Sequence, residues 1–337
     1  MEVILTLLLT LVAAVAAAAP PADPQTLTTL TVEQAEELAG RRWHPRLTLD
    51  SLTELDPKAA AVLATHDGGI CFAALEDLSP ESARALAAHQ PLKKFGSFNL
   101  EFRALRQLAP ATAEVLATHA GNLRLPALER LDSPALAQKL ASQWGELKIG
   151  LTELTPEIAA ILATNEGVFE DRTRPGQVFR RADGARSVLW FAALPELSAP
   201  AAIALAGHQG VLVLNELSEL SPAAAAGLAR RAGGSLILNG LTRLSAETAD
   251  ALAGYDGELA MRALPAMSLA AAKALKRHQG RLHLTGLVDP TPEVLAVLRT
   301  HPQVRLPQPR PVAAGNVPNS ARQNSGHVAG PTARPDN

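Results

Sequence analysis

Residues Leu236 to Glu258 read LILNGLTRLSAETADALAGYDGE, and this stretch is one unit of a repeat that fills most of the 337-residue chain. Leu236 and Leu238 are two positions apart, which is the spacing of side chains on the buried face of a strand. Two more leucines follow across a bend, and Ser245 begins a short helix. The pattern then restarts at Leu259.

The same spacing recurs along the chain at intervals of about 23 residues. The first strand residues of successive units are Leu47, Ile70, Leu100, Leu123, Leu147, Leu189, Leu212, Leu236, Leu259 and Leu282. One such unit is too small to bury its own apolar face, so units must stack on their neighbours. Aromatic residues make up only 3% of the chain. Many small layers of Leu and Ala are therefore expected, in place of one aromatic-centred core.

The start and end of each helix have recognisable signals. Ser, Thr or Asp stands at the start, and proline often follows, as in Ser221-Pro222. Such a residue caps the helix, and proline at the first helical position loses no hydrogen bond. A glycine beyond the last turn is expected to supply a left-handed cap. The glycines at this position are Gly68, Gly121, Gly210, Gly257 and Gly280.

The two ends of the chain differ from the repeat. Residues 4–18 are mostly apolar, and Ala16 and Ala18 are the small residues that signal peptidase needs. An uncleaved anchor is the alternative, although the run is slightly short for a membrane span. We predict a signal peptide over 1–18, a Pro-rich spacer over 19–26, the solenoid over 27–306 and a disordered tail over 307–337. The protein is then exported to the periplasm, the cell surface or the medium, with no stable membrane span after cleavage.

Two insertions interrupt the repeat, at about residues 90–98 and 166–187. The second is charged, rich in Gly and Arg, and lacks the leucine pattern. We expect it to form a loop on the rim of the solenoid.

The alternation of a short LxL strand and a helix, over about Leu27 to Leu306, resembles the leucine-rich repeats, in a bacterial variant. The resemblance implies an α/β solenoid with short parallel strands on the concave face, short helices on the convex face, and protein binding. One position departs from the family pattern, because leucine stands where Asn is usual, three residues beyond the second strand leucine. These residues are Leu52, Leu75, Leu105, Leu128, Leu194, Leu217 and Leu241. The asparagine ladder between turns is therefore expected to be absent.

Composition and motifs argue against several functions. The formal net charge is -2, so no basic field attracts nucleic acid. Glycine-rich phosphate loops and CxxC metal spacings are missing from the sequence, and most Ser and Asp residues occupy helix caps. We predict no enzyme activity, no cofactor and no metal.

A polar column stands ten residues after each helix cap. Its members are His66, His89, His119, Gln143, Asn165, His208, Arg231, Tyr255, His278 and His301. A metal-binding or pH-sensing ladder is one interpretation. A structural role is favoured, because a histidine in the last turn can bond free helix carbonyls, and neighbouring helices stand roughly 8–10 Å apart, too far for easy shared chelation.

Cys71 is the only cysteine, so an intramolecular disulfide is impossible. Strand alternation between Ile70 and Phe72 places it on the face away from the core. We expect a half-buried, inert thiol, or one that pairs with another chain.

The concave face is the surface most suited to binding. The residues between the two strand hydrophobics are Thr48, Cys71, Glu101, Arg124, Lys148, Trp190, Val213, Ile237, Ala260 and His283. Within this central column, Glu101, Arg124 and Lys148 form a charged zone. Trp190, Val213 and Ile237 form an apolar run over three turns about 4.8 Å apart. Exposed apolar clusters often mark interaction sites.

We therefore predict an exported, non-catalytic scaffold that binds a protein or peptide, with Trp190, Val213 and Ile237 as anchors and Arg124 and Lys148 as orienting charges. The insertion could instead cover Trp190. A structural envelope or surface spacer without a dedicated ligand is one alternative, and polysaccharide binding is another.

Overall fold

The computed structural model describes residues 23–41, 46–90, 100–143, 145–165 and 187–307, with the backbone of 169–170 and 178–179. Two units are distinguished, Met1–Pro307 and Gln308–Asn337, and all described residues belong to the first. The predicted signal peptide, the first insertion after residue 90 and the predicted tail after Pro307 lie outside the described residues. Those assignments stay predictions.

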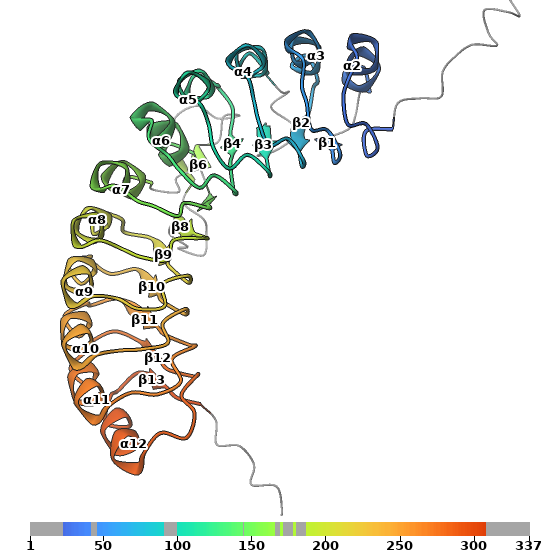
Figure 1. Cartoon of the computed structure of the whole chain (residues 1–337). Coiled ribbons are helices and arrows are strands. Elements are labelled where there is room, and N and C mark those ends of the chain that lie inside the picture. The colour runs from blue at the N-terminus through green and yellow to red at the C-terminus, as the bar shows by residue number, and fades with distance from the viewer. Residues whose placement is uncertain are drawn as a thin grey trace, which may run out of the picture. The chain divides into compact units, whose positions relative to one another are not determined.

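Short strands and short helices alternate along the first unit, with the helices along one side and the strands along the other (Figure 1). The strands of the repeat are β1 (Arg46–Leu49), β2 (Gly69–Phe72), β3 (Leu100–Phe102), β4 (Leu123–Arg124), β5 (Glu146–Ile149), β8 (Val188–Phe191), β9 (Val211–Val213), β10 (Ser235–Ile237), β11 (Glu258–Ala260), β12 (Leu282–His283) and β13 (Val304–Arg305). The helices are α2 (Val32–Ala39), α3 (Pro57–Leu63), α4 (Pro80–Ala87), α5 (Pro110–Ala117), α6 (Pro134–Ala141), α7 (Pro156–Ala163), α8 (Ala199–Leu205), α9 (Pro222–Leu228), α10 (Ala246–Leu252), α11 (Leu269–Leu275) and α12 (Pro292–Leu298).

Equivalent residues of successive turns pair in register. Leu236 of β10, for example, lies between Leu212 of β9 and Leu259 of β11, and all three strands are parallel. The strands of the repeat form two sheets, in the orders β1-β2-β3-β4 and β13-β12-β11-β10-β9-β8-β5. The predicted parallel sheet is therefore present, but it is interrupted between β4 and β5.

The hydrogen bonds of β4 differ from those of the strands before it on both edges. In the two preceding turns, the N–H groups of Ala73 and Arg103 donate to the turn before. The equivalent residue after β4 is Pro126, which has no N–H, so β4 is short. On the other edge, the Leu123 N–H donates to the side-chain oxygen of Gln143 and not to the backbone of β5.

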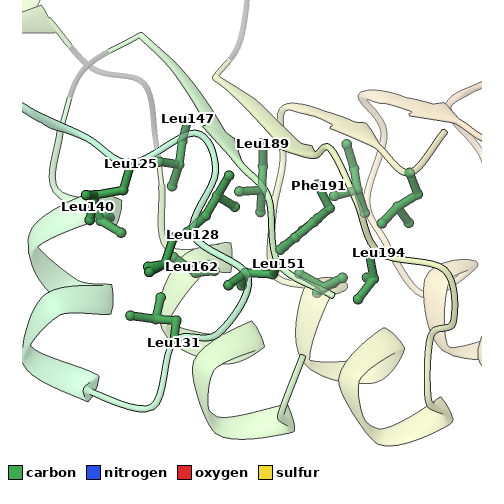
Figure 2. Packing of buried hydrophobic residues seen from close by; sticks show 14 of the residues in the cluster. Leu125, Leu128, Leu131, Leu140, Leu147, Leu151, Leu162, Leu189, Phe191 and Leu194 are labelled. Atoms are coloured by element: carbon green, nitrogen blue, oxygen red, sulfur yellow. The ribbon is translucent and has the colours of Figure 1, made fainter. Parts of the chain in front are cut away.

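The hydrophobic core continues across this break. Leu125 and Leu147 come from the turns on either side of it and point into the same interior (Figure 2). Buried leucines and small alanines from every turn belong to one cluster, in which Leu128, Leu151 and Leu162 are fully buried. Burial of apolar surface contributes about 25 cal/mol per Å², and this contribution is spread over all turns of the repeat.

The helix starts follow the sequence signals. The hydroxyl of Ser221 accepts the N–H of Ala224 at 3.2 Å, and Pro222 occupies the first helical position. The carboxylate of Asp56 accepts two N–H groups of α3 in the same way. These caps explain why helices of seven or eight residues begin at the same point in each turn.

The predicted role of the glycines is wrong. Among the described residues, the glycines with positive φ are Gly145, Gly233 and Gly234, and none of the five predicted cap positions is included. A Cβ on Gly280 would lie 1.8 Å from the carbonyl oxygen of Gly257, and one on Gly257 would lie 2.4 Å from that of Gly234. Glycine is needed here because the backbones of stacked turns approach closely. The helices end in the right-handed conformation instead.

A short asparagine ladder is present at another position of the repeat. The Asn239 N–H donates to the side-chain oxygen of Asn215 at 3.2 Å, and the Arg262 N–H donates to that of Asn239 at 3.0 Å. These asparagines directly follow the second strand leucine. The expected absence therefore holds for the family's usual position but not for the chain as a whole.

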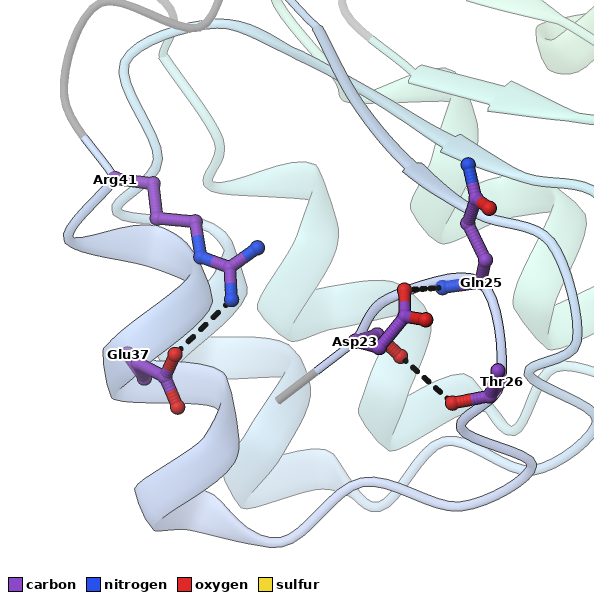
Figure 3. A network of polar contacts seen from close by, with 5 residues as sticks. All are labelled: Asp23, Gln25, Thr26, Glu37 and Arg41. Atoms are coloured by element: carbon purple, nitrogen blue, oxygen red, sulfur yellow. Dashed lines mark hydrogen bonds and ion pairs between the residues drawn. The ribbon is translucent and has the colours of Figure 1, made fainter. Parts of the chain in front are cut away.

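Two further segments depart from the plain repeat. In the second insertion, β6 (Phe169–Glu170) and β7 (Val178–Phe179) pair antiparallel, and the predicted loop did not include this strand pair. At the other end, Asp23 accepts the N–H of Gln25 at 3.0 Å, while Arg41 pairs with Glu37 on α2 (Figure 3). The Ser51 hydroxyl bonds the carbonyl of Gln25, which attaches this first turn to the next.

Candidate binding surface on the strand face

The predicted apolar anchors lie side by side on three paired strands. Trp190 of β8 pairs with Val213 of β9, which pairs with Ile237 of β10. Trp190 and Ile237 are half-buried, whereas Val213 is 7% exposed. The middle of the patch is therefore less exposed than expected. We call these three residues the apolar patch.

Lys148 of β5 extends the apolar patch by one strand. It pairs in register with Trp190, and its ammonium group lies 4.2 Å from the centre of the Trp190 ring. Such a cation–π contact holds the ring and the charge together at about 0.5–1 kcal/mol for an exposed pair. Four consecutive strands thus present one cation and three apolar side chains.

The other two charged residues predicted for the site, Glu101 and Arg124, lie on the first sheet, across the break from Lys148. Glu101 of β3 and Arg124 of β4 are register partners. Glu101 is 8% exposed and bonds Arg46 and Arg103, so its charge is neutralised within the protein. Burial lowers the pKa of Arg124, with the nearby Glu101 opposing that shift. Glu101, Arg124 and Lys148 nevertheless line one pocket, which spans the sheet break.

Cys71 is more buried than its strand position predicts. It lies on the strand face, yet it is fully buried, because neighbouring strands bring Arg46 and Glu101 over it. Burial raises the pKa of its thiol. The thiol is free and inaccessible, so pairing with another chain would require this cover to move.

The polar column is buried at every position except the half-buried Gln143, and most of its members bond backbone groups. Its members bond carbonyls at the ends of preceding helices: His119 bonds Ala87 of α4 at 3.2 Å, and Asn165 bonds Ala141 of α6 at 3.0 Å. The sequence predicted that each residue bonds the carbonyls at the end of its own helix. In the structure, the bonded carbonyls end the helix of the preceding turn instead. Other members bond the column residue of the preceding turn, as His89 does with the carbonyl of His66 at 3.1 Å.

Burial keeps these histidines neutral at neutral pH. It lowers the pKa of both His119 and His208 to about 4, and nearby positive charges add to the effect. Burial also lowers the pKa of His89, His278 and His301. In the described ranges, no group of three or more His, Cys, Asp or Glu residues is placed to hold a metal ion.

The strand face carries a second charged group, which the sequence pattern did not predict. Arg262, Arg281 and Arg305 flank the strand hydrophobics of the last three strands, and all three are exposed. Each acts electrostatically on His283, which is 5% exposed and pairs with Glu258 at 3.0 Å. Arg262 and Arg281 stand in the columns on either side of the central one, while Arg305 continues the central column as the register partner of His283.

The repeated turn decides the architecture: one short strand, one short helix, parallel pairing in register, and inward leucines that form a single core. The fold is a leucine-rich-repeat solenoid. No protein-family model and no curated protein matches the chain. A similar solved structure is a leucine-rich-repeat protein of Leptospira interrogans, at 17% identity and a TM-score of 0.35, covering 83% of this chain and 75% of that one.

The helices of this leucine-rich-repeat solenoid are short. Over the part of the chain that the structure describes, no helix has both the length and the apolar character that a membrane span requires.

Proposed function

We propose that the chain is an exported, non-catalytic scaffold that binds a protein or peptide through its strand face. The observation that carries this proposal is the apolar patch of Trp190, Val213 and Ile237 on paired strands, with Lys148 stacked on Trp190. Leucine-rich-repeat folds commonly mediate protein binding, but fold alone assigns no site.

The rigidity of the strand face supports a binding role. Each side chain of the apolar patch stands on a hydrogen-bonded strand above a fully buried core, so little conformational entropy is lost when a partner binds. Aromatic and apolar residues held in this way, with charges beside them, have the character of interface hot spots. Export is supported by the apolar N-terminal sequence.

Two alternatives predict different behaviour. A structural spacer would tolerate changes in the apolar patch. A polysaccharide site would need several aromatic platforms, and Trp190 is the only Phe, Tyr or Trp in the central column. The geometry therefore favours a protein or peptide partner.

The test compares the full chain with a Trp190→Asp, Ile237→Asp double variant. Both are immobilised and exposed to envelope extract, and retained proteins are identified and then titrated in pure form. We expect a partner that the double variant binds at least tenfold more weakly, since two anchors of about 1–2 kcal/mol each are lost.

The matched control is Ile203→Asp with Leu269→Asp. These are exposed apolar residues on helices α8 and α11, so the same chemical change is made away from the strand face. Thermal unfolding of all variants checks folding. Equal binding by the strand-face variant and the parent chain would contradict the site, and no specific binding by either would favour the spacer.

A further inference from the structure

The last three strands of the strand face present arginines without acid partners. Arg262 follows β11, Arg281 precedes β12, and Arg305 lies in β13. Among the described residues, none of the three forms an ion pair. We call Arg262, Arg281 and Arg305 the arginine cluster. On the first sheet, by contrast, Glu101 pairs with two arginines.

The one acid beside the arginine cluster is already engaged. Glu258 pairs with the ring of His283 at 3.0 Å and accepts the hydroxyl of Ser235 at 3.3 Å. Glu258 carries a single negative charge, so it offsets at most one of the three positive charges. Like charges on neighbouring strands repel each other, and a ligand carboxylate would relieve that repulsion.

The arginine cluster and the apolar patch lie on one continuous sheet. The order from β9 to β12 is β9-β10-β11-β12, so His283 stands three strands from Val213, or about 14 Å. Lys148 on β5 stands two strands from Val213 on the other side, or about 10 Å. The surface is thus apolar at its middle and basic at both ends.

We propose that the strand face binds an extended acidic peptide segment that crosses the strands, with an aromatic or aliphatic residue on the apolar patch and carboxylates at the arginine cluster and at Lys148. This names the chemistry of the partner and rests on the proposed function. An extended chain advances about 3.3 Å per residue. Its acids should then lie about four residues from the apolar anchor on one side and about three on the other.

A polypeptide fits this surface better than a nucleic acid. A phosphate backbone needs basic residues at regular short intervals, whereas here an apolar patch separates the two basic ends.

The probe is a labelled ten-residue peptide with tryptophan at position five, glutamates at positions one, two, nine and ten, and alanine and serine between. Anisotropy titrations use the full chain in low and high salt. A glutamine version keeps the shape without charge, a lysine version reverses the charge, and a serine version removes the tryptophan. We expect the acidic peptide to bind about tenfold more tightly than the glutamine version in low salt, and high salt to remove the difference.

The key variant is Arg262→Gln, Arg281→Gln, Arg305→Gln, in which exposed residues change and the core does not. We expect it to lose the tenfold preference. The control changes exposed basic residues of α3, α4 and α11 instead: Lys58→Gln, Arg84→Gln, Lys273→Gln. It should bind as the parent chain does, and thermal unfolding checks all variants.

Three outcomes would overturn the proposal. Equal binding of acidic and glutamine peptides would reject the charge preference but leave the apolar site intact. Tighter binding of a single-stranded oligonucleotide than of the acidic peptide would indicate a nucleic-acid surface. No binding of the acidic peptide at millimolar concentration would reject the acidic segment, while the partner capture described above would still test the proposed function on its own.

Discussion

Acid should destabilise the solenoid through its buried histidines. The side chains of His119 and His208 are fully or almost fully buried, and burial lowers the pKa of each from 6.5 to about 4. Neither Nε2 of His119 nor Nδ1 of His208 has a hydrogen-bond partner among the described residues. A proton added there would be a buried charge without an acceptor, with Lys139 or Arg231 nearby to repel it.

The sign and size of the effect follow from proton linkage. Above about pH 6.5 the histidines are neutral in both the folded and the unfolded chain, so they do not affect stability. Between about pH 6.5 and pH 4, the two histidines are protonated in the unfolded chain but mostly neutral in the folded chain, so the free energy of unfolding falls as the pH falls. At pH 5 each of the two histidines lowers the free energy of unfolding by about 2 kcal/mol, and together by about 4 kcal/mol. That is a large share of the roughly 5–15 kcal/mol typical of a domain.

The assay is urea unfolding followed by circular dichroism at pH 7.5 and pH 5.0. The His119→Gln, His208→Gln variant should lose about 4 kcal/mol less than the parent chain over this interval, since Gln already occupies this column at Gln143. Lys58→Gln is the control, because it changes an exposed side chain on α3 and removes no buried imidazole, so it should leave the pH dependence of the parent chain unchanged. If the double variant and the parent chain show the same pH dependence, the buried column does not set acid sensitivity.

Two further predictions concern close packing. Gly280→Ala should lower the free energy of unfolding by about 1–3 kcal/mol in the same urea titration, because its Cβ would overlap the carbonyl of Gly257. Gly254→Ala is the control and should be nearly neutral, because the nearest contact of its Cβ would be 3.5 Å away. The Cys71 thiol should react with a thiol reagent far more slowly in the folded chain than in urea, and fast reaction of the folded chain would show that its cover opens.

The fold could be predicted because every level of the sequence agrees. The leucine spacing predicts the strand, the Ser221-Pro222 type of start predicts the helix, and the period predicts stacking, and the structure confirms each. The error at Gly280 is of another kind. A glycine after a helix is typical both of a left-handed cap and of a close backbone approach, and only the neighbouring turn distinguishes them.

The short β4 and its redirected hydrogen bond were beyond the sequence pattern for a similar reason. Pro126 is visible in the sequence, but its effect depends on which carbonyl its missing N–H would have met in the turn before. The redirected bond from Leu123 to Gln143 joins residues that strand periodicity does not connect. The repeat register assigns residues to columns, but it does not determine which hydrogen bonds form between columns.

The candidate site depends on the same distinction between a column and its neighbours. Reading the central column alone placed Glu101 with Arg124 and Lys148 as one charged zone, yet Glu101 is neutralised by arginines from the adjacent columns. Arg262 and Arg281 stand in the columns beside the central one, whereas Arg305 continues the central column as the register partner of His283. All three keep their charge, because no described acid forms an ion pair with them. In a solenoid, the binding character of the strand face therefore depends on the charge balance across columns and turns. At the arginine cluster, positive charge exceeds the negative charge beside it.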